Sequence, residues 1–396
     1  MNLKRYLVNN MKKILLLILI ILTIISGYFI YNNYINKTEE KEKNTEEKSN
    51  MEKVSDDLFG KFYSKSEEML KEMTLEEKVG QLFLVRYDTY VADKYIKNYN
   101  VGGFVLFAKD FDAKTKDIIT NEISNRQSIS KIPLTIAVDE EGGYVTRVSR
   151  FKNFRDEKFY SPKYYYETGG YELLETIENE KSTLLKSLGI NLNLAPVADI
   201  STNPNDFIYS RSFGLDAAST STFIKNMVSY SNNNKMSSCL KHFPGYGNNV
   251  DTHTGVAIDT RTYDIFTNSD YLPFIAGIEE DVPYILISHN IMQSVDYEYP
   301  ASLSHKVITG ELRDKLKFSG IVITDDLDMD AVKAYAAGGN AATLAINAGA
   351  DVIITSDLVN MYNEIINNVN SGIIKIETID KAVKRILSWK LAYEII

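Results

Sequence analysis

Polar side chains that can do chemistry stand at the ends of several short apolar runs in this chain. These residues are Asp139, Asp199, Lys241 with His242, His289 and Asp325. Carboxylates and imidazoles serve as nucleophiles and acid/base catalysts, and cationic side chains hold polar substrates in place. One such carboxylate, for example Asp325 taken alone, is explained equally well as the cap of a following helix. Repetition of the pattern at five runs favours a common site.

A second group of such residues follows His242 in a segment rich in glycine and proline. Residues 241–247 read KHFPGYG, which predicts a loop, and Asp251 and His253 come shortly afterwards. A carboxylate near an imidazole can hold its tautomer and raise its basicity, which suits a general acid/base near neutral pH. For these two residues taken alone, a solvent-exposed turn is the simpler explanation.

The amino-acid composition argues against several other classes of function. The chain has four histidines, with no H-x-H or H-E-x-x-H pair, and a single cysteine, Cys239. The sequence therefore predicts no metal, no cofactor and no intramolecular disulfide, and Cys239 is interpreted as a buried structural thiol. The net charge is −9, and no basic cluster lies beyond the extreme N-terminus. Nucleic acid is not expected as a partner, because binding phosphates requires concentrated Lys and Arg.

The elements that must position these residues follow an alternating pattern. Eight short apolar runs, each followed by a segment with helical spacing, predict strands at Leu82–Arg86, Gly103–Phe107, Leu134–Asp139, Asn193–Asp199, Ser237–His242, Tyr284–His289, Gly320–Asp325 and Asp351–Thr355. Eight β/α units indicate an α/β fold of the TIM type, a (β/α)8 barrel forming a single catalytic domain. A doubly wound open sheet is the main alternative. In a barrel the carboxyl ends of the strands share one face, where catalytic groups collect.

Local sequence patterns predict the first and the last helix of this domain. Thr74 and Glu77 predict a capping box at its first helix, and the segment Thr378–Ile396 has apolar residues at helical spacing and predicts a closing helix. Along the seventh strand, alternation places Asp325 on the face of Ile321 and Ile323 and its neighbour Asp326 on the other face. The sequence does not say which face points inward.

The N-terminus predicts a membrane anchor. Four Lys and Arg residues precede residues 14–30, an uncharged apolar run at the lower end of the length that spans a bilayer. Positive charge before the run places the rest of the chain outside the cytoplasm, with an uncleaved anchor favoured over a cleaved signal peptide. The expected organisation is an anchor at 1–36, a flexible Lys/Glu-rich linker at 37–57 and the barrel at 58–396. The expected location is the cell membrane, with the barrel outside.

Six motifs, in this order, resemble glycoside hydrolase family 3. They are IAVDEEGG (136–143), NLNLAPVADI (191–200), RSFG (211–214), KHFPGYG (241–247), DTH (251–253) and ITDDLDM (323–329). The likeness is to the single-barrel branch that includes β-N-acetylhexosaminidases of peptidoglycan recycling, and it spans about residues 73–389. Three departures are a Gly-Tyr-Gly where Gly-His-Gly is usual, a loop from Lys241 to His253 that is one residue shorter, and Tyr144 where Arg is common.

The resemblance implies a role for each matching residue. Asp325 matches the catalytic nucleophile, and His253 with Asp251 matches the dyad that serves as general acid/base. The positions that match holders of sugar hydroxyls are Asp139, Arg211, Lys241 and His242, and His289 matches a position near that subsite. This set implies a retaining reaction through a glycosyl-enzyme. Retaining glycosidases generally use two carboxylates, so an imidazole in the acid/base role departs from that rule.

The implied function is exo-hydrolysis of terminal β-linked sugars, first of all N-acetylglucosamine from peptidoglycan fragments. Because the shortened loop helps to define the pocket, a β-glucosidase or β-xylosidase of the same fold remains an alternative. A non-catalytic wall-binding barrel is a second alternative, which the presence of Asp325, Asp251 and His253 disfavours. A phosphate-binding barrel enzyme is disfavoured as well, because residues 356–360, after the eighth strand, contain no glycine.

Overall fold

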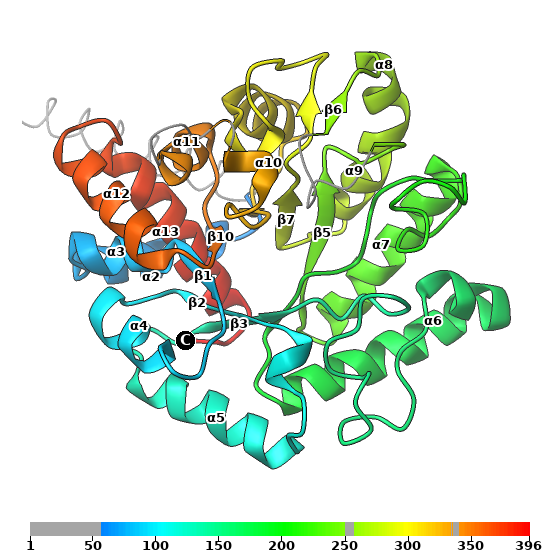
Figure 1. The fold of residues 1–396 in the computed structure, drawn as a ribbon, viewed down its shortest axis with the longest axis horizontal. Helices are drawn as coiled ribbons and strands as arrows, with labels where there is room; N and C mark the ends of the chain where they lie inside the picture. Colours follow the sequence, from blue (N-terminus) through cyan, green and yellow to red (C-terminus); the bar gives the residue numbers. More distant parts are fainter. Residues whose placement is uncertain (1–56, 250–256, 334, 336–339) are drawn as a thin grey trace, which may run out of the picture. The chain divides into compact units, whose positions relative to one another are not determined.

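Parallel strands at the centre of the domain form a closed barrel with helices outside it (Figure 1). The computed structural model describes residues 57–249, 257–333, 335 and 340–396. In these residues the sheet order is β10-β1-β2-β3-β4-β5-β7-β9, and a bridge between Ile323 and Val352 joins β9 to the start of β10. The predicted (β/α)8 barrel is confirmed, and the open doubly wound sheet is excluded.

The barrel strands are β1 (Phe83–Arg86), β2 (Gly103–Leu106), β3 (Thr135–Val138), β4 (Leu192–Asn193), β5 (Ser237–Phe243), β7 (Tyr284–Ile287), β9 (Ile321–Thr324) and β10 (Ile353–Thr355). Two short strands, β6 (Ile258–Asp259) and β8 (Ile291–Met292), pair with each other outside the barrel. Nearly every barrel-strand residue is buried, because the inner face fills the barrel and the outer face packs on helices.

The α-helices are α2 (Tyr63–Lys71), α3 (Leu75–Gln81), α4 (Ala92–Tyr99), α5 (Lys116–Ile129), α6 (Pro162–Ser187), α7 (Ala217–Asn233), α8 (Tyr263–Ile265), α9 (Tyr271–Glu279), α10 (Asp330–Lys333), α11 (Ala341–Ala348), α12 (Leu358–Asn370) and α13 (Ile376–Ala392). The shorter 3-10 helices are η1 (Gly60–Phe62), η2 (Ala108–Asp110) and η4 (Ala301–Leu303), and the π-helical segments are η3 (Phe266–Asp270) and η5 (Lys306–Lys315).

The fourth strand is the one that the sequence placed wrongly. A strand was expected at 193–199, but β4 ends at Asn193. The segment after it still accompanies β5, since Ala198 donates to the Lys241 carbonyl oxygen at 2.7 Å and Lys241 donates to that of Pro196. Pro196 has no N–H to donate, so the regular ladder stops before it.

Two local predictions are confirmed. The Thr74 hydroxyl accepts from the Glu77 backbone at 3.3 Å, and the Glu77 carboxylate accepts from the Thr74 backbone at 3.1 Å, which completes the capping box at α3. The closing helix forms as α13, although it ends at Ala392. Trp389 on this helix is buried, and its indole N–H donates to the Ser237 hydroxyl at 2.8 Å. Cys239 is buried, as expected.

The predicted membrane anchor lies outside the described residues, as does all but the last residue of the linker. Among the residues that the structure describes, no helix combines the length and the apolar character needed to cross a membrane.

Candidate active site

A cavity of about 210 Å³ opens at the carboxyl ends of the barrel strands. Each of the eight strands, or the turn directly after it, contributes a lining residue, so the cavity lies on the barrel axis. Five of the predicted site residues line it, namely Asp139, Arg211, Lys241, His242 and Asp325. Its volume is below the roughly 300–1,000 Å³ of pockets for drug-sized ligands.

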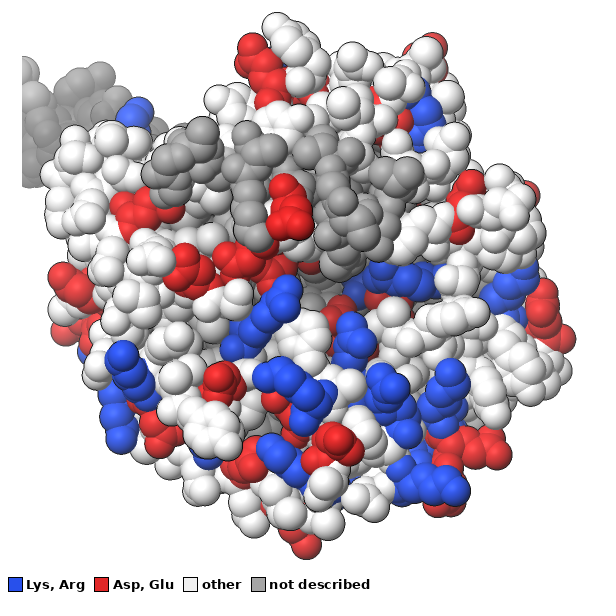
Figure 2. Space-filling model, in the orientation of Figure 1, with Lys and Arg blue, Asp and Glu red and all other residues white. Residues whose placement is uncertain are grey.

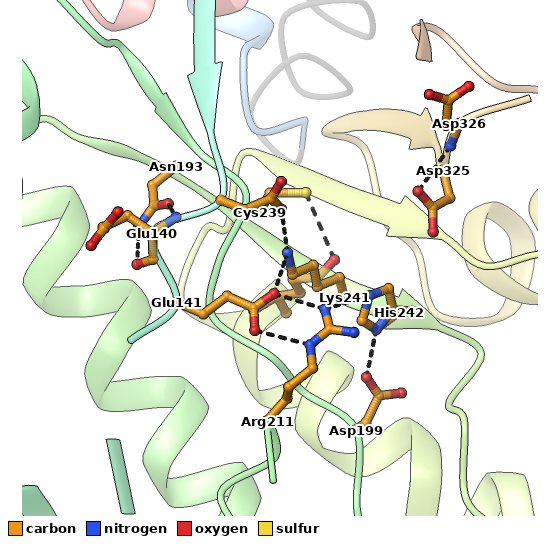
Figure 3. A network of polar contacts seen from close by, with 12 residues as sticks. Glu140, Glu141, Asn193, Asp199, Arg211, Cys239, Lys241, His242, Asp325 and Asp326 are labelled. Carbon is orange, nitrogen blue, oxygen red and sulfur yellow. Dashed lines mark hydrogen bonds and ion pairs between the residues drawn. The ribbon is translucent and has the colours of Figure 1, made fainter. Parts of the chain in front are cut away.

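Buried ion pairs organise one wall of the cavity (Figure 3). The Lys241 ammonium lies 2.6 Å from the Asp139 carboxylate and 2.7 Å from the Glu141 carboxylate. The Arg211 guanidinium grips Glu141 with two donors, at 2.7 and 3.1 Å. A fork of this kind fixes both direction and distance, so the cationic donors are held in place before a ligand arrives.

Burial and ion pairing act in opposite directions on the pKa values of this network. Burial alone would raise the pKa of the Glu141 carboxyl, but Arg211 and Lys241 outweigh it and hold that pKa well below its usual range. Burial alone would lower the pKa of Lys241, but Asp139 and Glu141 raise it above the usual value. Both groups are therefore charged at neutral pH, so Lys241 can donate hydrogen bonds but is not suited to act as a general base.

His242 is held by contacts on both of its ring nitrogens. Its Nδ1 lies 2.7 Å from the Asp199 carboxylate, and its Nε2 lies 3.2 Å from an Arg211 nitrogen. Since arginine only donates, Nε2 accepts and the proton is on Nδ1, where it is donated to Asp199. Asp199 also accepts from the backbone N–H groups of His242 and Tyr246. This carboxylate therefore sets both the tautomer and the orientation of the ring.

Two adjacent carboxylates stand across the cavity from this wall, directly after β9 (Figure 3). The Asp325 carboxylate accepts from the backbone N–H of Asp326 at 2.8 Å, and its own N–H donates to the Ile287 carbonyl oxygen. Asp326 pairs with Arg86 at the end of β1. Burial raises the pKa of the Asp326 carboxyl, and a backbone N–H and Arg86 partly offset that effect.

His289 lies behind these carboxylates and is fully buried. Its Nε2 donates to the backbone oxygen of Asp326 at 3.0 Å, and its Nδ1 accepts from the Ser302 hydroxyl at 2.7 Å. It does not line the cavity, so its contact is with the backbone that carries the two carboxylates. Its expected place near the sugar subsite stays a prediction.

The turn that carries Glu141 is held by a glycine and by a buried carboxylate. Gly142 has φ +99°, and a Cβ there would lie 2.3 Å from the Tyr160 carbonyl oxygen, so no side chain fits. Glu140 is fully buried and accepts from the backbone N–H groups of Arg147 and Val148 at 2.7 and 2.8 Å. Glu140 and Gly142 thus hold the turn in place, whereas Glu141 between them faces the cavity.

The predicted acid/base dyad, Asp251 and His253, lies outside the described residues, so that assignment stays a prediction. The described residues contain no cluster of three or more His, Cys, Asp or Glu that could hold a metal. Several charged residues of the site had no role predicted from the sequence, among them Glu141 and Asp199. Glu141 was within a quoted motif without a role, and Asp199 was noted at a strand end but not assigned. Only the recurrence of charged residues at strand ends pointed to Asp199.

Comparisons with known proteins agree on one family. Residues 74–389 match the family model described as glycosyl hydrolase family 3 N terminal domain. The β-hexosaminidase A of Pseudoalteromonas piscicida is 30% identical over 276 residues, 65% of this chain and 46% of that protein, so the chain spans about half of that relative's length. The β-hexosaminidase LpqI of Mycobacterium tuberculosis is 27% identical over 325 residues, 79% of this chain and 82% of that protein.

A solved structure has a similar fold. The glycoside hydrolase family 3 β-N-acetylglucosaminidase from a Paenibacillus species superimposes with a TM-score of 0.76 at 29% sequence identity. The match covers 82% of this chain and 63% of that one.

Proposed function

Because the chain belongs to glycosyl hydrolase family 3, we propose that it is a retaining exo-glycosidase that removes terminal β-linked N-acetylglucosamine. The observation that carries the proposal is the shared cavity. Asp325 lies in the same space of about 210 Å³ as the charged wall formed by Asp139, Lys241 and Arg211. A nucleophile opposite fixed hydroxyl-binding groups is the arrangement that glycosyl transfer to an enzyme requires.

The proposed reaction has two displacements. The Asp325 carboxylate forms a bond to the anomeric carbon as the glycosidic C–O bond breaks, and His253 gives its proton to the leaving oxygen. Water then attacks the anomeric carbon, passes a proton to His253 and releases Asp325 as carboxylate, so the configuration is retained. Their ion pairs already hold Lys241 and Arg211 in position to donate to the sugar hydroxyls. These side chains therefore do not have to become ordered again in each turnover.

The sugar is inferred from relatives that are named β-hexosaminidase and β-N-acetylglucosaminidase. A panel of nitrophenyl β-glycosides tests it, and we expect the N-acetylglucosaminide to have the highest kcat/KM. Hydrolysis of the glucoside or xyloside alone would contradict the N-acetyl assignment but keep the mechanism. Binding of wall fragments with no sugar released from any substrate would instead support the wall-binding barrel.

We further propose that peptidoglycan fragments are the substrates and that the enzyme acts outside the cytoplasm, tethered by residues 14–30. The basic flank before this apolar run and the Lys/Glu-rich segment after it support the tether. Fractionation of cells that express the full chain is expected to place it in the membrane, and protease added to spheroplasts should degrade the barrel. A matched chain that begins at residue 37 should be absent from the membrane fraction. Protection of the barrel from the protease would contradict the proposed orientation.

A further inference from the structure

A compact network of ion pairs lies outside the lining of the cavity. The Arg261 guanidinium lies 2.7 Å from the Asp259 carboxylate and 2.9 Å from the Asp270 carboxylate, and it donates to both oxygens of each. Both carboxylates are 3% exposed, and none of the three residues lines the cavity. The charged side chains in the lower half of Figure 2, by contrast, lie at the surface, with Lys and Arg intermixed with Asp and Glu. The network is therefore separate from the charged surface.

The network joins the two ends of the segment 250–256. Before this segment, the Asn249 side-chain amide donates to the Asp259 carboxylate at 2.6 Å, and the Gly245 carbonyl oxygen accepts from Arg261 at 3.3 Å. After the segment, the chain continues into the network itself, because Asp259 is on β6, which pairs with β8. The chain thus enters and leaves this segment through residues that one guanidinium holds together.

Two glycines of the KHFPGYG motif allow the chain to lie directly against this network. Gly245 has φ +119°, and a Cβ there would lie 2.6 Å from an Asp270 oxygen. Gly247 has φ +53°, and a Cβ there would lie 2.3 Å from an Arg261 nitrogen. A side chain at either position would displace the ion pairs. The Arg261 guanidinium carbon also lies 4.6 Å from the centre of the Phe266 ring, so contacts of several kinds fix its position.

Stability alone is a poor explanation of this network. One cation faces two anions, so one negative charge is not balanced within the network. Burial raises the pKa of the Asp270 carboxyl to about 6, although Arg261 lowers it, so the ion pairs do not fully offset the lost hydration. Buried ion pairs often add little stability compared with well-packed apolar residues, but they can specify one geometry. The geometry specified here is that of the two ends of the segment 250–256.

We infer that Arg261 is a positioning residue for the acid/base group of the reaction. This inference rests on the proposed function, in which His253 gives a proton to the leaving oxygen and later accepts one from water. Arg261 does not line the cavity, so it acts through the ends of the segment that carries His253. An acid must reach hydrogen-bond distance of the oxygen that it protonates, so a displacement of about 1 Å is costly.

Two aryl N-acetyl-β-glucosaminides test the inference, because they differ in their need for a proton. Phenolate is a poor leaving group unless it is protonated as the bond breaks, whereas 2,4-dinitrophenolate leaves without a proton. The readout is the ratio of their kcat/KM values, phenyl over dinitrophenyl, in one preparation. Since both values come from the same active sites, the ratio does not depend on the fraction of protein that folds. We expect Arg261→Gln to lower this ratio by about tenfold to a hundredfold, because a misplaced acid loses part of its roughly 10²–10⁴-fold contribution.

Matched variants separate positioning from the loss of a buried ion pair. His253→Ala removes the acid itself and should lower the ratio further. Asp270→Asn keeps one acceptor for Arg261 and should lower the ratio by less, and it provides the test if Arg261→Gln does not fold. Arg313→Gln removes a guanidinium of similar burial, which pairs with Asp351 and donates to two backbone oxygens outside the cavity lining, and should leave the ratio unchanged.

The outcomes distinguish this inference from the proposed function. An unchanged ratio in Arg261→Gln, with a lowered ratio in His253→Ala, overturns the inference and leaves the proposed function standing. An equal loss in Arg313→Gln also overturns the inference, because the effect would then follow from any lost ion pair. An unchanged ratio in both Arg261→Gln and His253→Ala overturns the inference together with the proposed role of His253. If the native protein hydrolyses neither substrate, both proposals fail.

Discussion

Replacement of Asp325 by asparagine is expected to lower kcat by at least about 10⁴-fold, the scale seen when a covalent catalyst is removed, while the protein stays folded. Asparagine has the same shape and can still accept from the Asp326 backbone N–H through its amide oxygen. The amide cannot displace the leaving group, so the first bond to the anomeric carbon does not form. Initial rates with the nitrophenyl N-acetylglucosaminide, alongside circular dichroism, check this result.

Asp326→Asn is the matched control, since the residue is adjacent, of the same type and in the same cavity. Its carboxylate already pairs with Arg86, so we expect a loss of about a hundredfold or less, arising from a misplaced arginine. Asp325→Asn should still bind the sugar product. Labelling with a 2-fluoro or 5-fluoro glycosyl fluoride, followed by peptide mapping, should place the adduct on Asp325. An adduct on Asp326, or the larger loss in Asp326→Asn, would move the nucleophile to the second aspartate.

The sequence alone was sufficient for the barrel and for five of the residues that line the cavity. Each barrel strand is a short apolar run bounded by polar residues, and its carboxyl end is marked by where the run stops. The end of the apolar run gave the wrong end for β4, because Pro196 has no backbone N–H and the regular ladder stops before it. It placed Asp139, Lys241, His242 and Asp325 together because parallel strands end on the same face.

Details of the site that depend on long-range contacts were not accessible in this way. Glu140 and Glu141 are neighbours of the same type, yet one binds backbone N–H groups of its own loop and the other binds Arg211, 70 residues away. Nothing in the local sequence distinguishes them. Alternation placed Asp325 and Asp326 on opposite faces, but both line the cavity, since β9 ends at Thr324 and the regular alternation ends with it.

Glu141 pairs with two cations that are distant in sequence, Lys241 and Arg211. Glu141→Gln is therefore the substitution with the largest expected effect on the free energy of unfolding. The carboxylate is 4% exposed and lies against both cations. Without its charge, Asp139 and, for Arg211, Asp199 are the nearby anions that the described residues still provide. Removing one partner of a buried ion pair usually costs about 3–5 kcal/mol, and we expect a decrease in the free energy of unfolding of about 3 kcal/mol. Because Lys241 and Arg211 lose their orientation, kcat/KM should also fall by roughly a hundredfold.

Glu178→Gln provides a matched control within the same domain. Glu178 and Lys181 form another buried ion pair, at 3.0 Å, with both side chains about as buried as Glu141. Neither residue lines the sugar cavity, so this variant should lose a similar free energy of unfolding but keep its kcat/KM. Urea denaturation and steady-state kinetics on the two variants separate the two effects. Equal losses of kcat/KM would show that the activity reports stability alone.

The lowered pKa of Glu141 predicts how its contribution to the free energy of unfolding changes with pH. The pKa of Glu141 is held below its ordinary value of 4.5, so the stabilisation that its charge provides is fully present above that pH. It is lost as the pH falls through the lower pKa of the folded state, where the proton finally binds. The difference in unfolding free energy between the native protein and Glu141→Gln should therefore be constant from neutral pH to about pH 5 and shrink only below it. A difference that grows on acidification would mean that Glu141 is protonated in the folded protein, and Lys241 and Arg211 would then have to be balanced by another anion.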